Sequence, residues 1–205
     1  MQRFFITGTD TNVGKTLVSA WFCLNTGYGY FKPIQTGYIE GTDSYFVSKI
    51  VESKIYKESY LFKEPISPHL AACHENIVID ITKIRLPKTQ YLFVEGAGGL
   101  LVPINDRYCM IDLIKQLNIP AILVCHSKLG AINHTLLSLE ALRYRSINVC
   151  GIIISGEKNQ EICDTIEHYG QVEILGHLPF LKKINRETLK KITLSNKLKK
   201  IFELH

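Results

Sequence analysis

A glycine-rich segment near the start of the chain has the residue types that bind phosphate. Residues 8–16 read GTDTNVGKT and fit the pattern G-x-x-x-x-G-K-[ST]. The glycines let backbone N–H groups fold around phosphate oxygens, and the start of the following helix adds positive potential. Lys15 would neutralise the β- and γ-phosphates of a nucleoside triphosphate, and the Thr16 hydroxyl would bind Mg²⁺. This phosphate loop predicts a nucleotide site but leaves kinases, switches, transporters and ligases open.

Two carboxylates further along the chain could hold the metal. Glu95 ends the apolar run YLFVE and is followed at once by GAGG, whose glycines let the backbone approach a nucleotide. A carboxylate at the end of a strand beside the phosphate loop would bind Mg²⁺ directly or through water. Asp43, in EGTDS, is either a second metal ligand or the cap of the helix that follows.

A second lysine is placed to act on an anion. Lys32 closes an apolar run, and Pro33 fixes the backbone just beyond it. At the carboxyl end of a strand, the ammonium group would stabilise an anionic acceptor or a transition state near the γ-phosphate. Taken alone, such a lysine is more often a solvated surface residue. Its combination with the phosphate loop and Glu95 favours a role in the chemistry.

These residues follow strand-like runs that alternate with amphipathic helices. The runs occur at 3–7, 28–34, 91–95, 121–125, 149–155 and 172–179, with helices expected near 15–24, 43–53, 109–117, 130–145 and 158–169. This alternation predicts an α/β fold of three layers, similar to P-loop NTPases, with helices on both faces of a mostly parallel sheet. Ligands in such folds bind beyond the carboxyl ends of the strands.

Composition indicates one soluble domain over residues 1–205. The chain is 46% hydrophobic, and its six cysteines include no C-x-x-C pair. Several cysteines lie in apolar runs, which favours buried, reduced thiols and a cytoplasmic protein. No run approaches the roughly 20 apolar residues that span a membrane, and the start does not resemble a secretory signal.

The net charge of +5 comes from a basic C-terminal segment, residues 182–205. It holds eight of the 24 basic residues and two of the 19 acidic ones, so the rest of the chain is near neutral. Its isoleucines and leucines recur at roughly helical intervals, which predicts a packed helix with a solvated basic face. Nucleic acid or an anionic membrane is the alternative partner, but no aromatic residues are interleaved for base stacking. We therefore expect neither of these partners.

Six segments together resemble the dethiobiotin synthetase family. They are GTDTNVGKT, FKPIQTG (31–37), Thr42-Asp43, FKEPISPHLAA (62–72), VEGAGG (94–99) and KLGAINH (128–134), and the resemblance covers about residues 2–181. It implies an ATP- and Mg²⁺-dependent cyclo-ligase that closes a cyclic urea on 7,8-diaminononanoate with CO₂ or bicarbonate. One amine captures CO₂ as a carbamate, the γ-phosphate activates it as a mixed anhydride, and the second amine displaces phosphate, giving dethiobiotin and ADP.

The resemblance also implies a role for each matching residue. The catalytic set is Lys32, Lys15 and Thr36, and the metal set is Thr16, Asp43 and Glu95. The nucleotide set is Gly8, Asn12, Val13, Gly14, Lys15, Thr16, Leu17, Asp43, Glu95, Gly96, Ala97, Gly98, Ser155, Gly156, Pro179, Phe180 and Leu181. The substrate set is Thr11, Lys32, Thr36, Gly130, Ala131, Ile132 and Asn133.

The segment KLGAINH begins a helix whose free N–H groups suit a carboxylate. In the family, this helix start receives the distal carboxylate of the substrate from the neighbouring subunit. The resemblance therefore implies a homodimer with shared sites, in which Asn133 would hydrogen-bond that carboxylate. An ordinary capped helix, with Asn133 and His134 at the surface, is the alternative.

Two departures from the family pattern concern the nucleoside. Ser155 stands where the family usually has an asparagine that reads the adenine edge, and Lys182 and Lys183 stand where an acidic ribose contact is expected. Serine is too short for a bidentate contact, and one lost hydrogen bond is worth about 1 kcal/mol. We expect a looser choice of nucleobase, with other nucleoside triphosphates also used, unless Asn159 nearby restores the contact.

Three other functions share parts of this pattern. A partition-type ATPase switch would share the fold, but its loop resembles K-G-G-x-G-K-[ST], and its early lysine is Asp10 here. A cobyrinate-type amide ligase usually carries a glutaminase domain, for which 205 residues leave no room. A plain nucleotide-binding module would need neither Lys32 nor the helix start at Gly130.

Overall fold

The chain, described over residues 1–204 by a computed structural model, is built on one seven-stranded sheet. Its order is β4-β2-β6-β1-β7-β8-β9, and the strand pairs described in it are parallel. The strands are β1 (Gln2–Gly8), β2 (Gly29–Phe31), β4 (Ile55–Tyr56), β6 (Tyr91–Glu95), β7 (Ala121–Cys125), β8 (Val149–Ser155) and β9 (Ile174–Leu178). The predicted parallel sheet is confirmed.

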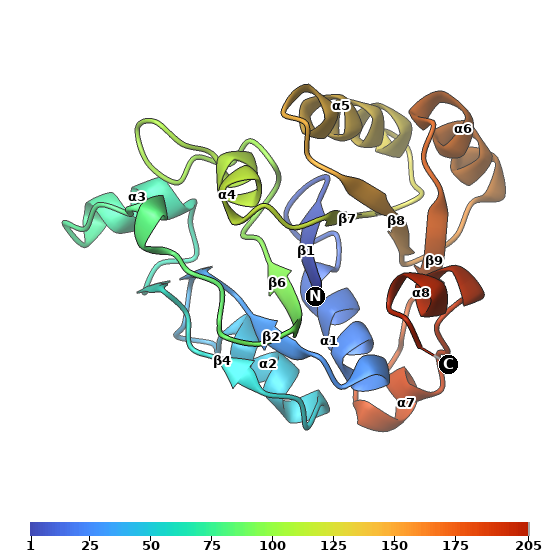
Figure 1. Ribbon diagram of the computed structural model, residues 1–205, viewed down its shortest axis with the longest axis horizontal. Helices are drawn as coiled ribbons and strands as arrows, with labels where there is room; N and C mark the ends of the chain where they lie inside the picture. Colours follow the sequence, from blue (N-terminus) through green and yellow to red (C-terminus); the bar gives the residue numbers. More distant parts are fainter. Residues whose placement is uncertain (205) are drawn as a thin grey trace.

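Helices cover both faces of the sheet, which confirms the three layers (Figure 1). One face carries α4 (Met110–Leu117), α5 (Ala131–Tyr144) and α6 (Gln160–Gly170), and the other carries α1 (Lys15–Thr26), α2 (Asp43–Ile50), α7 (Arg186–Lys190) and α8 (Asn196–Ile201). Side chains of one strand alternate between the layers. In β7, Ile122 and Val124 pack into the core around α1, whereas Leu123 and Cys125 pack with residues of α5 and α6.

The expected strand at 28–34 is broken in the structure. Residues 29–31 form β2, and residues after Pro33 form β3 (Ile34–Thr36), which leaves the main sheet and pairs with β5 (Tyr60–Phe62). Proline has no N–H to donate to a sheet ladder, so a central strand does not continue through it. The break places Lys32 at the end of β2 rather than inside a longer strand.

Residues 55–83 hold the elements that the sequence pattern did not predict. Besides β4 and β5, they include α3 (Pro68–His74) and a short 3₁₀ helix, η1 (Ile81–Lys83). Each is seven residues or shorter, which is too short to show a clear period. Apart from the broken run, the other expected strands and helices occur within a few residues of their expected ends.

The C-terminal segment packs against the rest of the protein, as predicted, although as two short helices and not one. Leu189, Leu194, Leu198 and Phe202 are buried in the core around α1. The indole N–H of Trp21 donates to the Ile192 carbonyl at 2.7 Å. All six cysteines have free thiols, but only Cys23, Cys125 and Cys163 are buried as expected, whereas Cys109 and Cys150 are half-buried and Cys73 is exposed.

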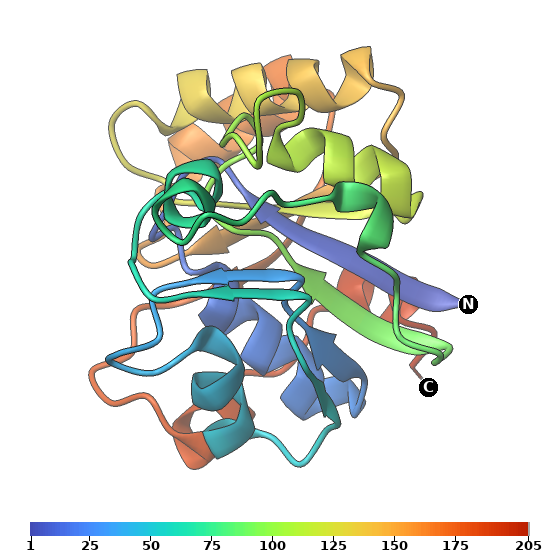
Figure 2. The ribbon, with the colours of Figure 1, turned by 90° about the vertical axis from the view of Figure 1, so that its left-hand side faces the viewer.

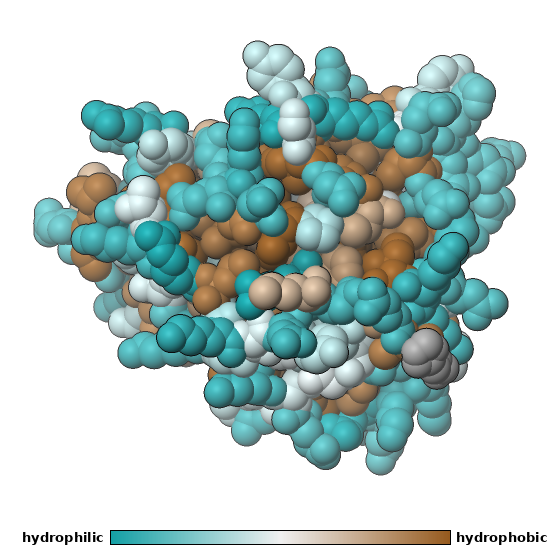
Figure 3. Space-filling model, viewed as in Figure 1, coloured by the Kyte–Doolittle hydropathy of each residue, from teal (hydrophilic) through white to brown (hydrophobic). Residues whose placement is uncertain are grey.

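The loops at the carboxyl ends of the strands gather at one edge of the molecule. In Figure 2 the strands run from the N terminus at the right towards the left, where the loop after β3 lies beside the segment after β9. Figure 3 looks onto the opposite edge, where apolar side chains are framed by hydrophilic ones. None of the helices described is both long and apolar enough to span a membrane.

Candidate nucleotide and substrate site

A cavity of about 1280 Å³ lies beyond the carboxyl ends of β1, β2 and β6. Small-ligand pockets are typically about 300–1,000 Å³, so this one has room for more than one ligand. Twelve of the predicted site residues line it: Thr11, Asn12, Gly14, Lys15, Thr16, Leu17, Lys32, Thr36, Asp43, Glu95, Ala97 and Gly98. The cavity therefore lies where a ligand site was predicted, beyond the carboxyl ends of the strands.

The phosphate loop leads directly into α1. Gly14 precedes the helix with φ of 93°, a left-handed conformation, and among the described residues no side chain caps this helix start. Its first N–H groups are therefore open to a ligand and carry the positive end of the helix dipole. Gly8, Val13 and Gly96 do not line the cavity. Val13 is buried in the core and anchors the phosphate loop there. The N–H of Gly96 donates to the Ile6 carbonyl at 3.0 Å, which ties the end of β6 to β1.

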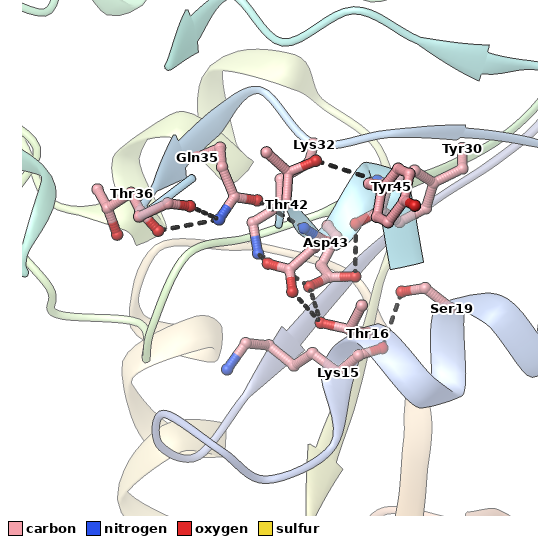
Figure 4. Close-up of polar contacts among 12 residues, drawn as sticks. Lys15, Thr16, Ser19, Tyr30, Lys32, Gln35, Thr36, Thr42, Asp43 and Tyr45 are labelled. Atoms are coloured by element: carbon pink, nitrogen blue, oxygen red, sulfur yellow. Dashed lines mark hydrogen bonds and ion pairs between the residues drawn. The ribbon is translucent and has the colours of Figure 1, made fainter. Parts of the chain in front are cut away.

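Four side chains at the base of the cavity form what we call the ion cluster: Thr16, Lys32, Asp43 and Glu95. Thr16, Lys32 and Asp43 are labelled in Figure 4. The Lys32 ammonium donates to Asp43 Oδ2 and, at 3.1 Å, to Glu95 Oε1. The Thr16 hydroxyl lies 2.8 Å from Glu95 Oε1 and 3.1 Å from Asp43 Oδ1. Lys32 is 6% exposed and Glu95 is 1% exposed, so neither is a solvated surface residue.

Sheet register explains why Lys32 and Glu95 meet. In the parallel pair of β2 and β6, Phe31 lies opposite Val94. The next residue on each strand is Lys32 and Glu95, so their side chains leave the sheet side by side.

Asp43 reaches the cluster from the first turn of α2. It is not the cap of that helix, because the side chain of Thr42 accepts the Tyr45 N–H at 3.0 Å and fills that role. The carboxamide of Gln35 accepts the Asp43 N–H at 3.1 Å and donates to the carbonyls of Thr36 and Gly37. Gln35 thus ties the start of α2 to the end of β3.

The ion cluster fits Mg²⁺ in its chemistry. It supplies a hydroxyl and two carboxylates, the hard oxygen ligands that Mg²⁺ prefers, and a lysine ammonium lies between the carboxylates. Residues 1–204 contain no group of three or more His, Cys, Asp and Glu side chains that could enclose a metal. Mg²⁺ does not need such a cage, because it usually keeps several waters and binds substrate phosphates.

The two lysines of the site are held differently. The Lys15 ammonium turns away from the cluster and donates to the Asp10 carbonyl at 2.7 Å (Figure 4). Burial lowers the pKa of Lys15 to about 8. Burial would also lower the pKa of Lys32, but the charges of Glu95 and Asp43 outweigh it and raise this pKa. Lys32 therefore stays positively charged, whereas Lys15 loses its proton in the weakly alkaline range.

Nucleotide binding is therefore expected to take up protons near pH 8. Phosphates favour protonated Lys15, so a group that is half charged in the free protein becomes fully charged, which corresponds to uptake of roughly 0.5 proton. Above pH 8 the affinity for ADP should fall, by up to about tenfold per pH unit. Calorimetry of ADP binding in two buffers of different ionisation enthalpy measures the uptake. Lys15→Arg, which stays charged, should lose it, and equal uptake in both proteins would contradict the assignment.

Ser155 and Gly156 lie beside the phosphate loop rather than along the cavity. A Cβ atom on Gly14 would collide with the Ser155 hydroxyl. The Ser155 carbonyl lies 2.7 Å from Nδ1 of His126, and the Gly156 carbonyl lies 2.6 Å from Nε2 of His177. Asn159 caps α6 by accepting the Ile162 N–H at 3.1 Å, so its side-chain oxygen is engaged elsewhere.

The predicted Pro179, Phe180 and Leu181 follow β9 and do not line the cavity, and Phe180 is 77% exposed. The next residues do reach it, since Ile184 and Asn185 form part of its wall beside α2. The sequence pattern missed them because they belong to the basic C-terminal segment, where no motif marks them.

The helix start at Gly130 to Asn133 is not brought to the cavity of its own chain. Gly130 has φ of 89° and precedes α5, and Asn133 is exposed. One part of the expectation is wrong, because the Ala131 N–H is not free and donates to the Lys128 carbonyl at 2.9 Å. Leu129 beside it is wholly exposed.

Tyr30 is a further residue of the site that the sequence pattern missed. It is fully buried, and its hydroxyl donates to Glu95 Oε2 at 2.9 Å. Burial, together with the charge of Glu95, raises the pKa of Tyr30 well above its usual value. An aromatic residue inside an apolar strand gives no sign in the sequence that its hydroxyl reaches a carboxylate 65 residues away.

The parallel sheet, phosphate loop and cavity define a P-loop nucleotide-binding protein. A family model described as an AAA domain matches residues 2–188. A ParA family ATPase from Chlorobium tepidum is similar in structure, with a TM-score of 0.52 and 13% identity over 98% of this chain and 97% of that one. The MinC:MinD cell division complex of Aquifex aeolicus gives a TM-score of 0.55 at 12% identity, over 99% of this chain and 94% of that one. At these identities the likeness is one of fold alone.

Similarity in sequence narrows the class. The chain is 56% identical to an ATP-dependent dethiobiotin synthetase of Lawsonia intracellularis over 98% of this chain and 99% of that protein. It is 44% identical to the synthetase of Paramagnetospirillum magneticum, over 92% and 93%. The chain belongs to the dethiobiotin synthetase family. This confirms the predicted ATP-dependent ligase and rules against the partition-type switch.

Proposed function

We propose that the protein forms dethiobiotin from 7,8-diaminononanoate, CO₂ and ATP, and that Lys32 is its central catalytic residue. The observation that carries this assignment is the position of Lys32, whose ammonium lies in the same cavity as the phosphate loop. The reaction joins two anions, a carbamate and a phosphoryl group, and a fixed cation between them lowers their repulsion.

The proposed reaction has three steps, as the family resemblance implies. One amine of the substrate attacks CO₂ and loses a proton, which gives the carbamate. A carbamate oxygen then attacks the γ-phosphorus and ADP leaves, so that the carbamate carbon becomes an activated mixed anhydride. The second amine attacks this carbon, loses its proton and expels phosphate. Ring closure is intramolecular, so holding the substrate near Thr36 contributes much of the rate acceleration.

The other residues of the cavity would hold and orient the reactants. Lys15 and the first N–H groups of α1 would bind the β- and γ-phosphates. Bound Mg²⁺ would neutralise phosphate charge, held by Thr16, Asp43 and Glu95. In the free protein the Lys32 ammonium donates to Asp43 and Glu95, and it would be available to the carbamate when these carboxylates hold Mg²⁺ instead.

We also infer a homodimer in which Gly130 to Asn133 of a second copy bind the distal carboxylate of the substrate. The support is that these residues lie outside the cavity of their own chain, while Leu129 beside them is wholly exposed. Sedimentation velocity should give twice the mass of the chain, and an active monomer would contradict the shared site. The six free thiols are consistent with a cytoplasmic location.

An isotope experiment tests the reaction. The purified protein is incubated with the diamine, ¹³C-bicarbonate and Mg·ATP, and the products are analysed by mass spectrometry. Dethiobiotin with the label in its ring carbonyl and an equal amount of ADP are expected. Release of ADP without labelled dethiobiotin would overturn the proposal in favour of another ATP-cleaving activity, and formation of neither product would overturn it in favour of a plain nucleotide-binding protein.

The choice of nucleobase is expected to be loose. Ser155 presents only a short hydroxyl beside the phosphate loop, and Asn159 is engaged as a helix cap. Lys182 and Lys183 are exposed. Initial rates with ATP and GTP should therefore yield kcat/KM values within roughly tenfold of each other, since about 1 kcal/mol separates binding with and without one hydrogen bond. Strict dependence on ATP would refute this prediction.

A further inference from the structure

The Glu95 carboxylate is held from two sides by different kinds of donor. Its Oε1 atom faces the cavity and accepts from Thr16 at 2.8 Å and from Lys32 at 3.1 Å. Its Oε2 atom faces the protein interior and accepts from the Tyr30 hydroxyl at 2.9 Å. The side chain of Glu95 is 1% exposed, so in the free protein water does not replace a missing donor on the inner side.

Tyr30 is itself immobilised by the core. It lies in β2 opposite Phe93 of β6 and belongs to the apolar cluster that includes Val18 and Trp21 of α1. Its buried ring is packed on all sides, and its hydroxyl donates to Glu95. Tyr30 and Lys32, which follows the same strand, are both labelled in Figure 4.

We propose that Tyr30 is a positioning residue that fixes Glu95 with Oε2 turned inward and Oε1 presented to the cation of the nucleotide. The inference rests on the proposed function in one respect, since it takes this cation to be the Mg²⁺ that accompanies ATP. A carboxylate held in this way binds the metal through one oxygen, and the metal gains a ligand that is already oriented. Hydrogen-bond partners of metal ligands typically contribute about 10- to 100-fold to metal affinity.

The test is Tyr30→Phe, which removes one oxygen and keeps the ring. Binding of Mn²⁺ is measured by electron paramagnetic resonance on the full chain with saturating ADP, so that the readout does not require turnover. The variant is expected to bind Mn²⁺ at least tenfold more weakly than wild type, and to require a similarly higher Mg²⁺ concentration for half-maximal activity. At saturating Mg²⁺ its kcat should return to near the wild-type value.

Tyr28→Phe is the matched control. Tyr28 is buried near the start of the same strand, and its hydroxyl donates to the Phe202 carbonyl at 2.7 Å, away from the ion cluster. It should lower the melting temperature to a similar extent without changing the affinity for Mn²⁺. Measurements are made below the melting temperature of each variant, with folding checked by circular dichroism.

Four outcomes would overturn the proposal or locate its failure. Wild-type affinity for Mn²⁺ in Tyr30→Phe would overturn it, and so would equal weakening in Tyr28→Phe. A loss of kcat that saturating Mg²⁺ does not restore would also overturn it, because Tyr30 would then act on the reaction by another route. If the wild-type protein with ADP bound no Mn²⁺, the metal in the proposed function would fail together with this inference, whereas labelled dethiobiotin could still form.

Discussion

Replacing Lys32 with alanine is expected to lower kcat for dethiobiotin formation by roughly 10²- to 10³-fold, the range found when one preorganised donor to a developing charge is removed. Lys32 is 6% exposed and its ammonium lies between two carboxylates, so water cannot replace it as a stabilising charge. Affinity for ADP should change much less, because Lys15 and the helix start hold the phosphates. Steady-state kinetics and ADP calorimetry on the same preparation separate the two effects.

Lys49→Ala is the matched control for Lys32. Lys49 lines the same cavity, but its ammonium lies over the Tyr45 ring, 4.7 Å from the centroid. It should retain kcat within a few-fold. Lys32→Ala should also melt at a lower temperature without metal, because its removal leaves Glu95 buried beside Asp43. Full activity in Lys32→Ala would refute the catalytic assignment. Equal losses of kcat in Lys32→Ala and Lys49→Ala would also refute it, because any positive charge in the cavity would then serve equally well.

Gly14→Ala is expected to weaken nucleotide binding, with at least a 10²-fold loss of affinity for ADP. Gly14 has φ of 93°, which costs an alanine about 1–2 kcal/mol. The added Cβ would in addition collide with the Ser155 hydroxyl, so the phosphate loop must move. A displacement of about 1 Å is enough to remove backbone donors from a ligand whose binding depends on their geometry. Calorimetry with ADP measures the loss.

Gly27→Ala separates backbone strain from the collision. Gly27 also has a left-handed conformation, with φ of 74°, but a Cβ there would meet no atom within 4 Å in the part of the chain that is described. This variant should lose about 1 kcal/mol of unfolding free energy and bind ADP as wild type does. If Gly14→Ala bound ADP as well as Gly27→Ala does, the close packing of the phosphate loop against Ser155 would not be needed for nucleotide binding.

Much of the site could be predicted because it rests on strand ends. Lys32 and Glu95 each follow an apolar run, and parallel strands bring such residues to one edge whatever the strand order. The sequence pattern did not give that order, so it could not show that β2 and β6 are neighbours with Phe31 opposite Val94. Asp43 stayed ambiguous for a local reason, since Thr42 and Asp43 are both good helix caps and only the fold shows that Thr42 serves.

The remaining residues of the site were hidden by their surroundings. Tyr30 and Gln35 lie in β2 and β3 and resemble ordinary strand residues, and their roles come from contacts across the fold. Ile184 lines the cavity because the segment after β9 packs beside α2, which no local pattern indicates. The expected helix start at Gly130 was placed correctly, but the hydrogen bond of the Ala131 N–H depends on a turn at Lys128.

The central place of β1 has a consequence for synthesis of the protein. The strand that carries the phosphate loop is made well before its two neighbours in the sheet, β6 and β7, which follow roughly ninety and one hundred and twenty residues later. Helix α1 in turn packs against Leu198 and Phe202, which are made later still. Pairings of such long range are slow to form. A nascent chain therefore carries the nucleotide motif long before it can complete the nucleotide site.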